Sequence, residues 1–227
     1  TNYTAGNNSK PITVQKGTIS LNLKAGKKTD LMQRLRAALG NVEDTYVLTL
    51  EAKGAYQDVL TGTVIFYENG QKLNQTQIPL TNGTASMEYS VRSAGTHEIS
   101  AEYVLPADGP EKENYNDPAQ VSCSFEVEKA DEDQIQIKEV DGKLYGEDPF
   151  ELELTGQKGK GAVKFSVPAD NGVLELSEVN GKTEAKIIGA GTVLVTAEVA
   201  GDSDYNGTTV TREITVGKAQ APEISVA

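Results

Sequence analysis

Acidic and amide side chains are spaced for calcium binding in one stretch near the C-terminal end, "DSDYNGTTVTRE". Asp202, Asp204, Asn206, Gly207 and Glu213 satisfy the pattern D-x-[DN]-x-[DN]-G-x5-E. Oxygen atoms at this spacing surround Ca²⁺ when the loop folds around the ion. The stretch is therefore a calcium candidate, and the elements on either side of it decide how much weight the pattern carries.

Those elements argue against calcium. A loop of this pattern lies between two helices, whereas alternating strand patterns precede and follow it here. Glu213 has the opposite strand parity to Ile214 and Val216, so we expect it on a solvent face, far from Asp202. The structural alternative is a corner in which Tyr205 buries its ring and the acidic residues form Asx turns. We expect this corner, a similar one at Tyr115, and no cofactor.

The sequence has few residues that could act as a catalytic nucleophile or as a nitrogen or sulfur ligand to a metal. The chain holds one cysteine and one histidine, so neither a catalytic triad nor a His-rich metal site can be assembled. Cys123 lies at an inward strand position and is expected to be a buried, inert thiol. His97 shares the parity of Ile99 at the start of a strand and is expected to be partly buried. We therefore expect no enzyme activity.

Carbohydrate-binding surfaces favour exposed aromatic rings, and this chain has no Trp and only 6% aromatic residues. Tyr56, in a loop, and Tyr67, out of phase with Val64 and Phe66, are the exposed candidates for a binding site. Scattered tyrosines are more often ordinary surface residues. The acidic run 131–133 is expected to be a solvated linker.

The net charge of -12 and the pI of about 4.6 exclude most nucleic-acid binding, because a phosphate backbone would be repelled. No apolar run is long enough to span a membrane. The sequence does not begin with Met, and we expect it to be a piece of a longer chain.

Period-two alternation dominates the chain and predicts strands in two sandwiches. The Asn-Gly or Asp-Gly pairs at 69–70, 82–83, 141–142, 171–172 and 180–181, most of them between such runs, predict type I′ hairpin turns. The expected strands of the first domain are 18–23, 45–53, 62–68, 71–79, 84–91, 95–104 and 119–128. Those of the second domain are 134–139, 150–155, 161–167, 172–176, 183–188, 191–200 and 208–216.

One segment has helical spacing instead, with Leu31, Leu35, Ala38 and Leu39 on one face. It predicts one short amphipathic helix at about 30–39, inserted in the first domain, where it would cover an edge or open end of the sandwich. Binding of a partner by this helix is the alternative.

One phrase occurs three times, with Tyr3, Tyr115 and Tyr205 in one slot and Lys16, Lys129 and Lys218 in another. The copies lie roughly 100 residues apart, which is the period of whole domains. We therefore expect the last strand of a preceding repeat at 1–16, sandwiches at 17–128 and 129–217, and the start of a following repeat at 218–227.

The second domain resembles the MBG-type bacterial immunoglobulin-like repeats. "YGEDPFELELTG", "GAGTVLVTAEV", "GDSDYNG" and the closing "VGKA" occur in the order typical of that family, across nearly all of 135–219. "GTVIFYENGQKL" and the following hairpin, about 62–104, resemble another bacterial Ig-like repeat type. The resemblance implies tandem Ig-like antiparallel β-sandwiches in a secreted or cell-surface bacterial protein, without catalytic residues.

The expected function is that of a non-catalytic spacer or stalk segment. Its expected partners are neighbouring Ig-like repeats of the same chain, and we expect a monomer. Two alternatives remain. One is an adhesin module that binds a host protein or glycan through loops of the first domain, around Tyr56 and the 30–39 helix. The other is an accessory module of an extracellular glycan-active enzyme.

Overall fold

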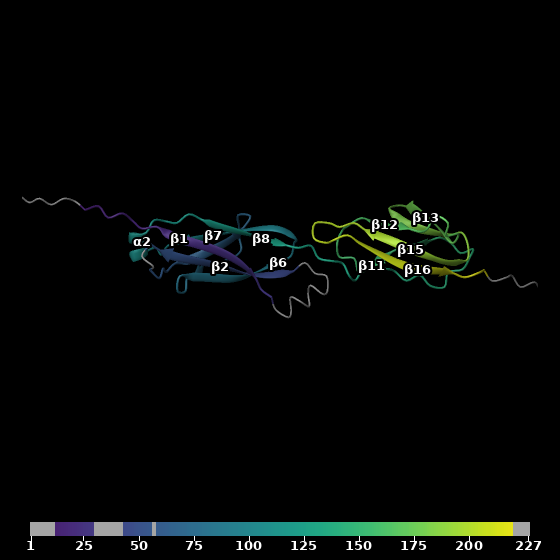
Figure 1. Ribbon diagram of the computed structural model, residues 1–227, viewed down its shortest axis with the longest axis horizontal. Helices are drawn as coiled ribbons and strands as arrows, with labels where there is room; N and C mark the ends of the chain where they lie inside the picture. The colour runs from purple at the N-terminus through teal and green to yellow at the C-terminus, as the bar shows by residue number, and fades with distance from the viewer. Residues whose placement is uncertain (1–11, 30–42, 56–57, 220–227) are drawn as a thin grey trace, which may run out of the picture. The chain divides into compact units, whose positions relative to one another are not determined.

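The computed structural model describes residues 12–29, 43–55 and 58–219 (Figure 1). The chain forms two compact units, and the main division falls between Phe125 and Glu126. Each unit is built from antiparallel strands, as the alternation predicts. The segment 30–39, for which a helix was predicted, and Tyr56 lie outside the described residues.

The first unit has two sheets, ordered β1-β2-β6 and β4-β3-β7-β8, with β5 paired to β3. If β4 and β5 are counted together as the fourth main strand, the first, second and fifth main strands (β1, β2 and β6) form one sheet. The third, sixth and seventh (β3, β7 and β8) form the other, which is the immunoglobulin-like arrangement. The strands are β1 (Ile19–Lys27), β2 (Asp44–Gly54), β3 (Thr63–Glu68), β4 (Gln71–Lys72), β5 (Ile78–Pro79), β6 (Thr84–Val91), β7 (Gly95–Val104) and β8 (Val121–Val127). The short helix α2 (Pro110–Asn114), which the alternation did not predict, lies between β7 and β8.

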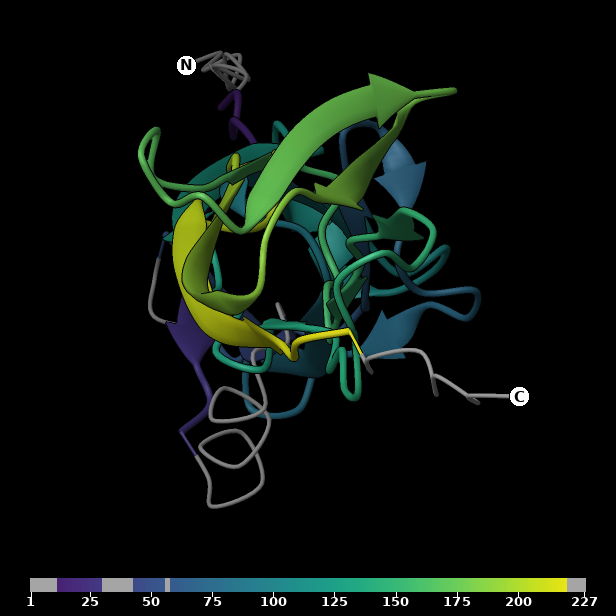
Figure 2. The same ribbon diagram turned by 90° about the vertical axis from the view of Figure 1, so that its right-hand side faces the viewer.

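The second unit repeats this arrangement with sheets β10-β14-β13 and β12-β15-β16 and a small pair β11-β9. Figure 2 shows the yellow β16 curving beside β15, with which it pairs along its whole length. The strands are β9 (Gln136–Ile137), β10 (Phe150–Glu151), β11 (Leu154–Thr155), β12 (Val163–Ser166), β13 (Leu174–Val179), β14 (Lys182–Ile187), β15 (Gly191–Val199) and β16 (Thr208–Val216).

Each unit buries the alternate residues of its strands. In the first unit the inward residues of β2, β3 and β7 supply much of the core, including Leu48, Leu50, Phe66 and Ile99. The second unit has its own cluster between the two sheets: Ile137, Leu152, Val173, Leu174, Ala185, Ile187, Val193, Val195, Ala197, Ile214 and Val216. Apolar burial of this kind is the main favourable term in folding.

Three of the five predicted turns are type I′. Asn69, Asn82 and Asn180 have φ of 48°, 52° and 53°, and the glycine after each also has positive φ. At the other two pairs only the glycine, Gly142 or Gly172, has positive φ. Asn171 instead uses its side chain, whose Oδ1 accepts the backbone N–H groups of Val173 and Leu174.

Two predicted strands are interrupted. The stretch 71–79 is divided because the Asn74 side chain takes a strand's place beside β3: its Oδ1 accepts the N–H of Phe66, and its Nδ2 donates to the carbonyl of Val64. The stretch 150–155 changes sheet. Phe150 and Glu151 pair with β14, whereas Leu154 and Thr155 pair with β9.

Candidate functional site

The repeated phrase makes backbone contacts between one copy and the next. In the first unit, the N–H of Gly17 donates to the carbonyl of Asn114 at 2.7 Å, and the N–H of Asn116 donates to the carbonyl of Gly17 at 3.1 Å. Gly17 thus forms a parallel β-bridge with Tyr115. Gly17 follows the lysine of the first copy, and Tyr115 is the tyrosine of the second.

The second unit has the same contact. The N–H of Ala130 donates to the carbonyl of Asp204 at 3.0 Å, and the N–H of Asn206 donates to the carbonyl of Ala130 at 2.9 Å. Ala130 forms the parallel bridge with Tyr205. The donors and acceptors lie at the same offsets from the tyrosine as in the first unit.

The lysine slot adds a third hydrogen bond. Lys16 Nζ donates to the carbonyl of Lys112 at 2.7 Å, and Lys129 Nζ donates to the carbonyl of Asp202 at 2.6 Å. Each acceptor lies three residues before the tyrosine. Lys112 belongs to α2, and the carbonyls of a helix's last turn lack partners within the helix. A lysine ammonium is a suitable donor to such a group.

We call this three-bond contact a clasp. Its incoming residues are Lys16–Gly17 in the first unit and Lys129–Ala130 in the second; its corner residues are 112–116 and 202–206. Both tyrosines lie between the sixth and seventh main strands of their sandwiches. Antibody-type sandwiches have their corner tyrosine at the connection before the sixth strand. Tyr115 and Tyr205 likewise lie at corners, but at the connection between the sixth and seventh strands.

The two tyrosines differ in burial. Tyr115 is 4% exposed, and its hydroxyl donates to a carboxylate oxygen of Asp58. Tyr205 is only half-buried, although the sequence predicted a buried ring. Burial, and then the nearby charges of Glu132, Asp204 and Asp202, raise the pKa of Tyr205.

A glycine packs against each tyrosine. A Cβ added to Gly54 would lie 2.4 Å from the Tyr115 hydroxyl oxygen, which is closer than real atoms approach. A Cβ added to Gly159 would lie 3.2 Å from Tyr205 Cδ2 and 2.8 Å from Asp202 Oδ2. The chain therefore approaches both corners where only a hydrogen atom fits.

Asp202 supports the second corner from within. Its Oδ1 accepts the N–H groups of Asp204 and Tyr205, each at 2.8 Å, and its Oδ2 accepts the N–H of Lys160 at 2.6 Å. Backbone donation from Lys160, Asp204 and Tyr205, together with the Lys129 charge, lowers the pKa of Asp202. This is the Asx turn that the sequence predicted as the alternative to calcium.

The structure does not gather the calcium-candidate residues around one point. The carboxylate oxygens of Asp202 already accept backbone N–H groups, and Asn206 Nδ2 donates to Asp131 at 2.8 Å. Glu213 lies within β16, opposite Leu194, about 20 Å along the strand from Gly207. Within the described ranges, no group of three or more His, Cys, Asp or Glu residues is placed to hold a metal ion.

One acidic residue of the predicted solvated run is buried. Glu132 is 6% exposed, and its Oε1 accepts the N–H groups of Lys158 and Gly159 at 2.5 and 2.7 Å. A buried carboxylate needs such donors. The prediction for Glu132 was wrong because strand parity carries no information about a side chain that caps a distant loop.

The remaining sequence candidates occupy separate places. Tyr67 is half-buried and donates from its hydroxyl to Glu102 at 2.6 Å, so its polar end is engaged across neighbouring strands. Cys123 is half-buried, and burial raises the pKa of its thiol, which disfavours the thiolate.

His97 belongs to a polar cluster inside the first unit. It is 8% exposed, its Nδ1 lies 2.7 Å from Glu68 Oε1, and its ring stacks on Phe125. The Tyr89 hydroxyl donates to the other oxygen of Glu68. The cluster gives the buried ring of His97 a hydrogen-bond partner, as buried polar groups require.

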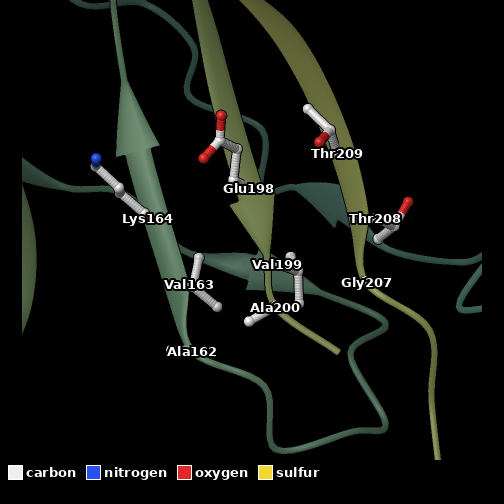
Figure 3. A pocket seen from close by; sticks show the side chains of 9 residues that line it. All are labelled: Ala162, Val163, Lys164, Glu198, Val199, Ala200, Gly207, Thr208 and Thr209. Atoms are coloured by element: carbon white, nitrogen blue, oxygen red, sulfur yellow. The ribbon is translucent and has the colours of Figure 1, made fainter. Parts of the chain in front are cut away.

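A broad hollow of about 720 Å³ lies over one end of β12, β15 and β16 (Figure 3). Figure 3 shows that Lys164, Glu198 and Thr209 come from three neighbouring strands. The lining offers one cation, one carboxylate and two threonines without a nucleophile–base pair.

In the described part of the chain, no helix is both long and apolar enough to cross a membrane.

No family model matches the sequence, and no curated protein matches it. Among solved structures, the chain is similar to a C-terminal 282-residue fragment of intimin, solved in complex with the intimin-binding domain of the translocated intimin receptor. The identity is 20%, the match covers 88% of this chain and 64% of the fragment, and the TM-score is 0.33. Fibronectin(III)-like modules of Clostridium thermocellum CbhA match at 14% identity over 81% of this chain and 90% of theirs, with a TM-score of 0.28.

Proposed function

We propose that this chain is a spacer segment of tandem immunoglobulin-like modules, which holds other parts of a bacterial surface or secreted protein at a distance and catalyses nothing. The observation that carries the proposal is the clasp. It occurs with the same three bonds in both units, although their corners are built differently, by α2 in one and by the Asp202 turn in the other.

The clasp shortens the free chain between modules. Val127 is the last residue of β8 and is buried, and Lys129 already belongs to the clasp of the second unit. Only Glu128 separates them. So short a connection between the end of β8 and the clasp has little conformational freedom compared with the flexible linkers that join independent domains.

Burial supports a tandem arrangement on the N-terminal side as well. Ile12 and Val14 are 89% and 87% exposed, whereas Ile214 and Val216, in the same slots of the repeated phrase, are 1% and 2% exposed. Side chains of this kind are normally inside a sandwich. We propose that residues up to Lys16 complete the last strand of a preceding module, and that the second unit is an MBG-type repeat.

Small-angle X-ray scattering of the chain tests the spacer proposal. A rigid spacer gives an elongated distance distribution that calcium does not change. A compact distribution, or one that broadens as expected for freely jointed units, would contradict it. A change of shape with calcium would show that the acidic residues around Asp202 bind the ion.

Recognition of a host protein or glycan by the first unit is the second candidate. Val59 is 69% exposed beside a hollow of about 190 Å³ lined by Asp58, Leu60 and Tyr115 among others. Binding measured on arrays of glycans and extracellular host proteins tests it. Binding that Val59→Asp abolishes would support an adhesin module, and absence of binding would favour the spacer.

A further inference from the structure

The third lysine slot has the sequence of an incoming clasp segment. Lys218–Ala219 follows the buried Val216 at the spacing with which Lys129–Ala130 follows the buried Val127. Both Lys218 and Ala219 are exposed. Neither contacts a tyrosine corner in the part of the chain that the structure describes.

Both observed clasps follow one rule. The incoming Lys–Gly or Lys–Ala pair binds the corner of the sandwich whose strands come after it in sequence: Gly17 binds beside Tyr115, and Ala130 binds beside Tyr205. Each described corner therefore already holds its own incoming pair. A corner for Lys218–Ala219 has to come from another sandwich.

We propose that Lys218–Ala219 is a docking segment for a further β-sandwich module of this type, placed after it in the chain. This inference rests on the proposed spacer function and gives it a specific joint. The site on the partner is a corner tyrosine with three backbone groups: a carbonyl three residues before it for the lysine ammonium, a carbonyl one residue before it, and an N–H one residue after it.

The chemistry needs no particular side chain on the partner beyond the tyrosine. Lys16 Nζ binds the carbonyl of a lysine, and Lys129 Nζ binds the carbonyl of an aspartate. The residue after the lysine has a small side chain in all three copies: Gly17, Ala130 and Ala219. A Cβ at Gly17 would lie 3.0 Å from the Tyr115 ring, so a bulky residue would strain that slot.

A three-module chain tests the proposal. Residues 1–219 are followed by a second copy of residues 131–217, so that Lys218–Ala219 stands before the added module as Lys129–Ala130 stands before the original. The chain has no Trp. Phe165→Trp in the added copy alone, at a side chain packed against the core, reports the unfolding of that copy by fluorescence.

We expect Lys218→Ala to raise the unfolding equilibrium constant of the added copy about fivefold, the effect of one hydrogen bond. Ala219→Pro, which removes the backbone donor, should raise it more than tenfold. Lys218→Arg keeps a cationic donor, so it should change the unfolding equilibrium constant of the added copy much less than Lys218→Ala does. The matched reference is Lys129→Ala in a two-module chain with Phe165→Trp, which should shift its own module equally.

The proposal would be overturned if neither Lys218→Ala nor Ala219→Pro changed the unfolding equilibrium constant of the added copy, whether or not Lys129→Ala has an effect. A shift that depends on protein concentration would overturn it in favour of docking between separate chains. The scattering test is independent of these results: the units could be freely jointed while Lys218 still stabilises the added module, or rigid while it does not.

Discussion

Tyr115 and Tyr205 occupy the same slot of the repeated phrase and differ in how much free energy they should contribute. Tyr115 is buried and donates to Asp58, whereas Tyr205 keeps contact with solvent. We expect Tyr115→Ala to lower the free energy of unfolding by about 3–5 kcal/mol, as for other large aromatic truncations. Tyr205→Ala should cost about 2 kcal/mol because less of its area is buried.

Tyr115→Phe separates the ring from the hydroxyl. It keeps the packing and leaves the Asp58 carboxylate without this donor, so we expect a loss of about 2 kcal/mol. Differential scanning calorimetry of the full chain measures all three variants. Equal losses for Tyr115→Ala and Tyr205→Ala would mean that the difference in burial has no energetic consequence.

Asp202 should make the second unit sensitive to acid. Its folded-state pKa lies below the ordinary value of 3.8 because backbone N–H groups stabilise the carboxylate. A group with a lowered pKa contributes stability above its unfolded pKa, and that contribution is lost as pH falls through the folded value. We therefore expect loss of stability below about pH 4, and a weaker acid dependence in Asp202→Asn.

Urea titrations between pH 2 and 7 measure this, with the exposed Asp170→Asn as the control variant. An identical acid dependence in Asp202→Asn and the parent would contradict the assigned role. The same samples test calcium, since a loop whose carboxylate already binds three N–H groups should show no rise in melting temperature when the ion is added.

At the residue scale, the sequence predicted the parts but not their partners. The Asx turn at Asp202 could be predicted because it is local. The burial of Glu132, the pairing of His97 with Glu68 and the contact of Lys129 with Asp202 join residues far apart in the chain. Nothing in strand parity or spacing identifies which distant backbone group a polar side chain will reach.

At the scale of elements, the loop around Lys158 and Gly159 depends on one buried carboxylate. We expect Glu132→Gln to lower the free energy of unfolding by about 1–3 kcal/mol, because two N–H donors lose a charged acceptor in a buried place. Its exposed neighbour offers the comparison Asp133→Asn, for which we expect less than about 0.5 kcal/mol. A similar small effect for both variants in urea denaturation would mean that the loop does not depend on Glu132.

Hairpin turns give a second prediction at this scale. Gly181 has φ of 76°, and an added Cβ would meet no atom within 4 Å, so Gly181→Ala imposes backbone strain alone. We expect a loss of about 1–2 kcal/mol. Gly26→Ala is the matched control, because that position also has open space and its φ is not positive. Equal losses of stability for the two variants in thermal unfolding would show that the positive φ of Gly181 does not determine the cost of the substitution.

Most strands were predictable because alternation and turn chemistry agree. The predicted 95–104 and 208–216 have the observed bounds of β7 and β16. The interruptions at Asn74 and between Phe150 and Leu154 were not, because they depend on what the neighbouring strand offers at each step. Helix α2 was missed because five residues are too few to establish a helical period.

At the scale of the whole molecule, the repeated phrase supplies residues to both sides of the clasp. Its tyrosine receives the pair that comes before it, and its lysine binds the module that comes after it. The sequence predicted that the phrase marks domain repeats, with a boundary between Tyr115 and Lys129, but it did not predict a contact between the copies. Only the fold brings the lysine of one copy to the tyrosine of the next.

If the proposed spacer function is right, the clasp restricts motion between the units, and ¹⁵N relaxation of the full chain tests this most directly. Ala130→Pro removes the clasp's N–H donor in the second unit without touching either core. We expect the amides of both units in the parent to fit one rotational diffusion tensor, as for a single rigid body. In Ala130→Pro we expect the two units to fit separate, shorter correlation times. Independent tumbling already in the parent, or an unchanged single time in Ala130→Pro, would contradict the account.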